Sequence, residues 1–123
     1  MVLNSEAADY LATSNKYWQQ ALKQFERREI EKAAELAWGS VAERVKALSL
    51  VRGGTNLPGH EQIRQYIKLI SNQLHDEELY QLFLVAQRLH VEFYESHLDA
   101  DDVRRDLTSV QKLLTKIDSL LYS

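Results

Sequence analysis

Apolar residues recur every three or four positions along most of the chain, which is the spacing of amphipathic helices. No segment shows the strict alternation of a half-buried strand. The pattern therefore predicts an all-α fold, an antiparallel up-and-down bundle of five helices in a single domain over residues 1–123. The predicted helices run from Ser5 to Arg28, Ile30 to Val51, His60 to Leu74, Glu77 to His97, and from Asp99 or Asp101 to the C-terminus.

Polar residues and glycines mark the ends of these helices. Asn4 or Ser5 could cap the first helix, and Asp76 stands where the N-cap of the fourth is expected. The segment from Gly53 to Gly59 contains the only proline of the chain and three of its four glycines. We therefore expect one clear loop, between the second and third helices.

The fifth predicted helix has an unusually broad apolar face. Its main row repeats with the spacing of a heptad seam, and Leu113 and Leu120 form a second row beside it. One helix of a small bundle rarely needs so much apolar surface for its own core. We therefore expect Leu113 and Leu120 to lie at a subunit interface, and we expect a homodimer.

Composition excludes several kinds of site. The net charge is −3, and residues 76–97 carry five acidic residues against one arginine, so this segment does not favour an anionic partner. Without cysteine there is no thiol catalysis and no thiolate metal site. No apolar run is long enough to span a membrane, and the first ten residues lack the layout of a signal peptide. We expect a cytoplasmic protein.

The segment RLHVEFYESH, residues 88–97, contains the densest group of reactive side chains. On a helical wheel His90 lies within the apolar arc with Tyr94 at its edge, whereas Arg88 projects about 160° away from His90. His90 is then either a core histidine bonded to Tyr94 or another group, or a residue that lines a cleft between helices. His97 lies roughly 10 Å from His90 along the axis, so we expect no shared metal ion and no other cofactor.

Two segments carry a resemblance to a known family. AAELAWGSVAERVKALSLVRG, residues 33–53, is an Ala-rich helix with a tryptophan and a Lys-Ala-Leu step, and LHVEFYESHLDADDV, residues 89–103, contains Leu-His-x-x-Phe-Tyr-Glu. Together they resemble the archaeal PaREP-type family within the HEPN superfamily. The resemblance implies a four- or five-helix bundle, often dimeric. Members of the superfamily act as metal-independent endoribonucleases or bind nucleotides.

Those ribonucleases place a histidine four to six residues after an arginine, because the arginine stabilises phosphate charge and the histidine transfers a proton. No arginine precedes a histidine at that spacing in this chain. We therefore expect a non-catalytic bundle that acts by self-association or by binding a protein partner. The alternative is a divergent endoribonuclease or nucleotide-binding protein. Its site would combine His90 and Tyr94 with positive charge for RNA or nucleotide from Arg44, Lys46 or Arg52.

Overall fold

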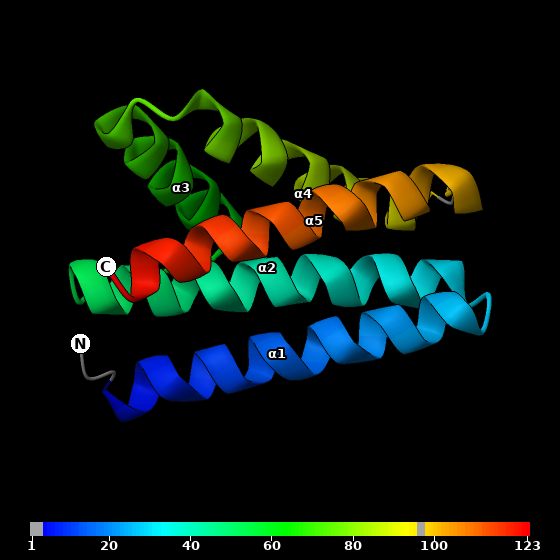
Figure 1. Cartoon of the computed structure of the whole chain (residues 1–123), viewed down its shortest axis with the longest axis horizontal. Coiled ribbons are helices and arrows are strands. Elements are labelled where there is room, and N and C mark those ends of the chain that lie inside the picture. Colours follow the sequence, from blue (N-terminus) through cyan, green and yellow to red (C-terminus); the bar gives the residue numbers. More distant parts are fainter. Residues whose placement is uncertain (1–3, 96–97) are drawn as a thin grey trace.

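A computed structural model shows five helices joined by short connections (Figure 1). It describes residues 4–95 and 98–123, and within this range the side chains of residues 92–95 are not described. The all-α prediction is confirmed, since the described ranges contain no strand. Helix ends differ from the predicted ones by at most two residues, apart from His97, which lies outside the described residues. The helices are α1 (Ser5–Glu26), α2 (Ile30–Arg52), α3 (His60–Leu74), α4 (Glu77–Glu95) and α5 (Ala100–Leu121).

Side chains cap the helices at the predicted places. The Asn4 side chain accepts a hydrogen bond of 2.7 Å from the backbone N–H of Ala7 at the start of α1. Asp76 accepts one of 3.3 Å from the N–H of Leu79 in α4, and Asp99 caps α5 in the same way. Each cap satisfies a backbone donor that the first turn of a helix leaves without an intrahelical partner.

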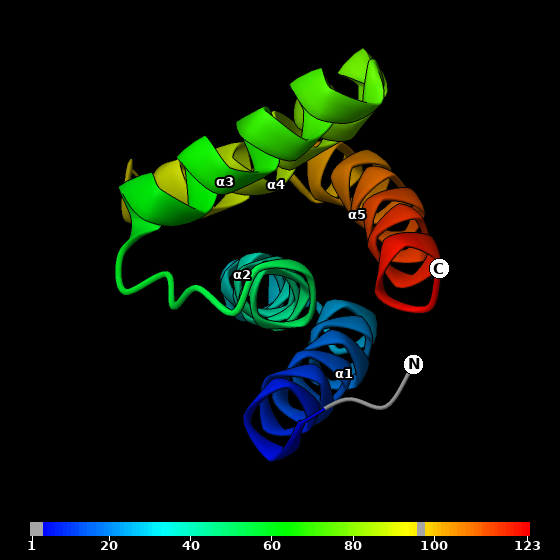
Figure 2. The same ribbon diagram turned by 90° about the vertical axis from the view of Figure 1, so that its left-hand side faces the viewer.

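Helix α2 lies at the centre of the bundle and contacts all four other helices. Figure 2 shows the α3–α4 hairpin on one side of α2 and α1 on the other, with α5 between them. Buried residues lie on most sides of α2, as a central helix requires. Several are small: Ala33, Ala34 and Ala37 are fully buried, and a side-chain carbon at Gly39 would come within 3.1 Å of the Tyr17 ring. The small residues therefore let α1 pack closely on α2.

Helix α5 packs against both α2 and α4, and this explains its broad apolar face. Leu113 is fully buried within the chain, and Leu120 is partly buried against the core. Leu113 therefore has no surface to offer to a second subunit, and the second apolar row of α5 belongs to the core. The predicted homodimer, if it forms, needs another surface.

The loop between α2 and α3 carries His60 back to the middle of α2. Gly54 adopts a left-handed backbone conformation with φ of +70°, which glycine tolerates without strain. The Ser49 hydroxyl donates a 2.7 Å hydrogen bond to the Thr55 carbonyl, and Leu57 is buried in the core. These contacts anchor the loop, so α3 begins beside the Trp38 ring.

Candidate functional site

His90 points inward from α4 and reaches a carboxylate on α2. Its Nδ1 lies 3.0 and 3.1 Å from the two carboxylate oxygens of Glu35. An ionised carboxylate can only accept hydrogen bonds, so this geometry places a proton on Nδ1. The His90 side chain is 24% exposed and that of Glu35 is 36% exposed. The inward direction predicted for His90 is thus observed, but its partner is a glutamate 55 positions away in the sequence.

Three rings meet beside this pair. The His90 ring stacks on Trp38 with a centroid distance of 5.5 Å, and His60 lies 4.7 Å from Trp38 on a tilted plane. The two imidazoles are themselves 5.5 Å apart, edge to face. We call Glu35, Trp38, His60 and His90 the Trp38 cluster. Three helices build it: Glu35 and Trp38 lie one turn apart on α2, His60 begins α3, and His90 belongs to α4.

Arg88 lies close to His90 in sequence but reaches a different helix. Its guanidinium donates a 2.7 Å hydrogen bond to Asp106 of α5. Burial raises the pKa of the Asp106 carboxyl, and the hydrogen bond from Arg88 opposes that rise. The Arg88 side chain is 51% exposed, so it lies partly in solvent as predicted but is ion-paired across helices. Tyr94, the other candidate near His90, belongs to the residues whose side chains are not described.

The basic candidates lie away from the Trp38 cluster. Arg44 lies six positions after Trp38 on α2, roughly 9 Å along the helix axis, and Arg52 lies roughly 21 Å beyond Trp38. The Lys46 ammonium lies 5.6 Å from the centroid of the Tyr10 ring. The structure thus does not bring the three basic candidates together with His90.

Arg44 is buried in a polar network between α1, α2 and α5. Its side chain donates to Ser14 at 2.9 Å, to Asp118 at 2.6 Å, and also to Asn15. The Ser40 hydroxyl donates a further 2.8 Å hydrogen bond to the Ser14 carbonyl. We call these five residues the Arg44 network. Arg44 is only 5% exposed and donates to three partners, so its guanidinium is occupied by contacts within the bundle.

A shallow groove runs between α1 and α5. The two helices have no close backbone contact in the described residues, but the Trp18 indole N–H donates a 3.0 Å hydrogen bond across the groove to Gln111. Beyond Phe25 and Arg104 the groove continues into a second hollow at the end of α1. We call it the α1–α5 groove, and its first hollow is lined by Trp18, Leu22, Phe25, Arg104, Leu107, Thr108 and Gln111.

Neither a metal-binding cluster nor a membrane-spanning helix is found in the described part of the chain. No group of three or more histidine, aspartate or glutamate residues there is arranged to hold a metal ion. None of its helices combines the length and the apolar character needed to cross a membrane.

Sequence reasoning missed most of these features. Glu35 is a charged residue on an amphipathic helix, which usually indicates a solvent-facing position, and His60 follows a loop without a motif of its own. The α1–α5 groove is lined by residues of two helices that are far apart in the sequence. Only the packing of α1 and α5 beside each other around α2 places these residues together.

The fold places the chain in the class of small all-helical bundles. The chain belongs to the Archaeal PaREP1/PaREP8 family, whose profile matches residues 9–114, and this confirms the resemblance to the PaREP-type family. A crystal structure of a protein from Sulfolobus solfataricus has the same fold, with a TM-score of 0.77 over 90% of this chain and 98% of that one. The two sequences are 20% identical, so the likeness concerns the fold alone. No curated protein matches the chain significantly.

Proposed function

We propose that this protein is a non-catalytic helical bundle of the HEPN type, located in the cytoplasm, that acts through protein contacts, either with itself or with a protein partner. One observation carries the proposal: the imidazole that a ribonuclease would need, that of His90, is held by the Glu35 carboxylate and stacked on Trp38. A histidine held in this way stabilises the packing of α4 on α2.

The electrostatics of the cluster support the same proposal. A site that cleaves RNA must stabilise the negative charge of a phosphate, which calls for arginine, lysine or backbone N–H donors. At His90 the described partner is instead a carboxylate, which repels phosphate. Along the axis of α2, Arg44, Lys46 and Arg52 lie roughly 9 to 21 Å beyond Trp38. Arg44 is in addition already bonded to Asp118 and Asn15.

The proposal is tested by incubating RNA with the wild-type protein in the presence of a chelator, alongside the His90→Ala variant. His75→Asn is the matched control, because His75 is exposed, and asparagine tolerates its left-handed backbone with φ of 53°. We expect no cleavage by any of the three proteins and a lower melting temperature for His90→Ala alone. Cleavage by the wild type that His90→Ala abolishes, with the helical circular dichroism signal intact, would refute the proposal.

One observation favours a second function, that of a divergent endoribonuclease or nucleotide-binding protein. His60 and His90 are both partly exposed and lie 5.5 Å apart, and a pair of imidazoles can serve as general acid and general base. In a Trp18→Phe variant Trp38 is the only tryptophan left, so its fluorescence reports on the cluster. A saturable fluorescence change on titration with ATP or with a short RNA, lost in His90→Ala, would favour this second function.

A further inference from the structure

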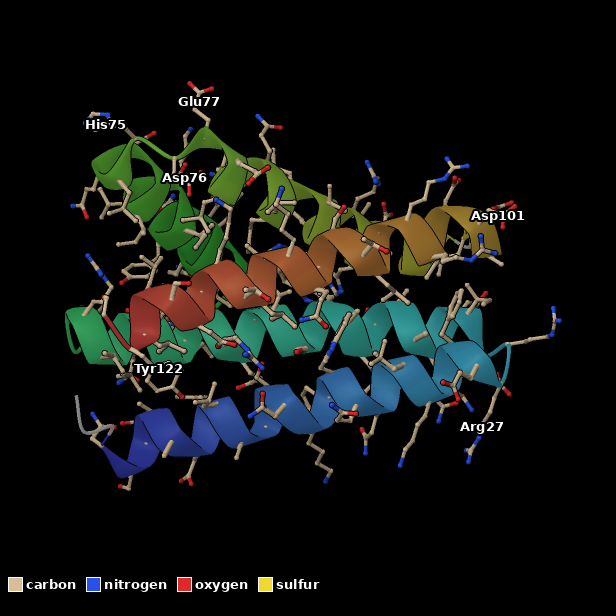
Figure 3. The ribbon with its side chains drawn as sticks, viewed as in Figure 1. Arg27, His75, Asp76, Glu77, Asp101 and Tyr122 are labelled. Atoms are coloured by element: carbon tan, nitrogen blue, oxygen red, sulfur yellow. The ribbon has the colours of Figure 1, made fainter. Side chains whose placement is uncertain are left out.

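Helix α1 is the element with the fewest neighbours in the described structure. It packs closely against α2 alone, whereas α5 contacts α2 and α4. Figure 2 shows α1 and α5 next to each other around α2, and the two helices run antiparallel: in Figure 3 Arg27 and Asp101 lie at one end of the molecule and Tyr122 at the other. The α1–α5 groove lies between them, so α1, α5 and the groove form one continuous face. We call it the α1–α5 face.

Apart from Arg104, uncharged side chains line the first hollow of the groove on both helices, although 27% of all residues are charged. The row on α1 has the 4-3-4-3 spacing of a heptad seam, and each of its members is exposed: Ala8, Ala12, Asn15, Gln19 and Leu22. The row on α5 is also exposed: Thr108, Gln111, Thr115, Ser119 and Tyr122. From Ala8 to Leu22 this exposed uncharged row spans roughly 21 Å of α1, and its heptad spacing is the one with which helices pack against each other.

Two residues of the face are large and apolar. Leu22 is 36% exposed at the apolar end of the groove, and Tyr122 is 58% exposed at the opposite end. Three hydroxyl groups on α5 bond back to carbonyls of their own helix, those of Thr108, Thr115 and Ser119. These groups are already satisfied, so covering this row would leave few donors without partners.

Charge along α1 identifies the occupant of this face. The first half of α1 carries Glu6 and Asp9 and no basic residue. The following segment, residues 16–28, is basic. It contains one acidic residue, Glu26, and four basic residues, Lys16, Lys23, Arg27 and Arg28. Two copies of α1 that run antiparallel place the acidic half of each beside the basic half of the other. Parallel copies would place like charges together.

We infer that the α1–α5 face binds a second copy of this chain, with the two α1 helices antiparallel across a two-fold axis. A two-fold interface must be self-complementary, and the two ends of α1 meet that requirement, because Asp9 of one copy lies opposite Lys23 of the other in the antiparallel arrangement. This inference rests on the proposed function, because it names the partner and the surface of the self-association. The predicted interface residue Leu113 is buried, so the inference places Leu22 and its neighbours at the subunit interface instead.

The inference is tested on the full-length chain by sedimentation equilibrium. We expect the wild type to have about twice the 14.3 kDa mass of one chain, and the Ala12→Glu plus Leu22→Glu variant to have the mass of one. Leu69→Glu plus Leu74→Glu is the matched control, because these two leucines of α3 are also exposed, at 51% and 40%. The control should stay dimeric. Circular dichroism verifies that each variant is folded.

A charge reversal provides a second, independent test. Asp9→Lys should weaken dimerisation, and Asp9→Lys combined with Lys23→Asp should restore it, because both charges of each antiparallel pair are then exchanged. A monomeric wild type at all concentrations would overturn the inference, and so would binding of a different helical protein at this face. A dimer that resists the α1 substitutions would overturn the surface but leave self-association standing. RNA cleavage, in contrast, would refute the proposed function whatever the mass.

Discussion

The Trp38 cluster and the Arg44 network lie on opposite sides of α2, and both place charged groups against the core. Arg44 is 5% exposed and donates hydrogen bonds to three residues. His90 is 24% exposed and is held on one side by Glu35. The guanidinium is fixed by hydrogen bonds to three residues, whereas the imidazole is held by the Glu35 carboxylate and by stacking on Trp38. Both groups stabilise the packing of other helices on α2, and they differ in how deeply the charged side chain is buried.

The largest expected effect is the loss of the buried cation. Arg44→Met should lower the free energy of unfolding by roughly 3 kcal/mol, because Ser14 loses its hydrogen-bond partner in the core and the more exposed Asn15 also loses one. The cost stays at the low end for a buried pair, since the side chain of Asp118 is 41% exposed and can be hydrated. Urea unfolding measures the change.

Lys46→Met is the control for Arg44→Met, because Lys46 is a basic residue of α2 two positions later and more exposed. It should change the free energy of unfolding by less than about 0.5 kcal/mol. Equal changes in the free energy of unfolding for the two substitutions would show that only the positive charge matters. The hydrogen bonds of the Arg44 network would then contribute nothing to stability.

The second largest effect on the free energy of unfolding is expected for a substitution in the Trp38 cluster. His90→Ala should lower the free energy of unfolding by about 1–2 kcal/mol, through loss of the hydrogen bond to Glu35 and of the stacking on Trp38. In a double-mutant cycle, Glu35→Ala and His90→Ala should show a coupling energy of about 1 kcal/mol at pH 7. Additive effects would mean that the pair is held by its neighbours and makes no stabilising contact of its own.

The smallest effect concerns a third, partly exposed network of ion pairs. The Lys116 ammonium lies 2.7 Å from Asp76 and 3.2 Å from Glu78 across α4 and α5. Hydrogen bonds from Lys116 lower the pKa of Asp76, and those from Lys112 and Lys116 lower the pKa of Glu78. Because both pKa values are lower in the folded state, the stabilisation is complete above the ordinary carboxyl pKa and is lost as the pH falls through the lowered values.

Lys116→Met should therefore reduce the melting temperature slightly at pH 7 and have almost no effect in strong acid, where Asp76 and Glu78 are protonated. Thermal unfolding followed by circular dichroism at a series of pH values measures this. A constant difference between wild type and variant at every pH would mean that Lys116 acts through the packing of its methylene groups and not through its charge.

The sequence predicted the helices better than it predicted the polar contacts between them. The three-to-four spacing, the Asn4 and Asp76 caps and the loop around Gly54 lead to the observed boundaries, because each depends on residues that are near neighbours in the chain. The inward direction of His90 also follows from its angle on the helix. Its partnership with Glu35 does not follow, because a glutamate in a helical pattern usually indicates a solvent-facing position.

Arg44 and Leu113 show the same difficulty from two other sides. The sequence predicts Arg44, a basic residue near the middle of a helix, as a ligand-binding candidate, but Asp118, 74 positions later, accepts its hydrogen bond at the edge of the core. The second apolar row of the fifth helix predicts a subunit contact, but α5 has two neighbours within the chain to cover it. In both cases the helix was predicted correctly and its neighbours were not.

What the sequence determined by itself is the local order of the chain: five amphipathic helices, their caps and the inward face of each. These features arise from hydrogen bonds and apolar spacing within a few residues. The tertiary structure decided which distant side chains meet, namely Glu35 with His90, Arg44 with Asp118, and α1 beside α5 with a groove between them. Such pairings depend on how whole helices pack, because a buried charge is stable only where another helix brings it a partner.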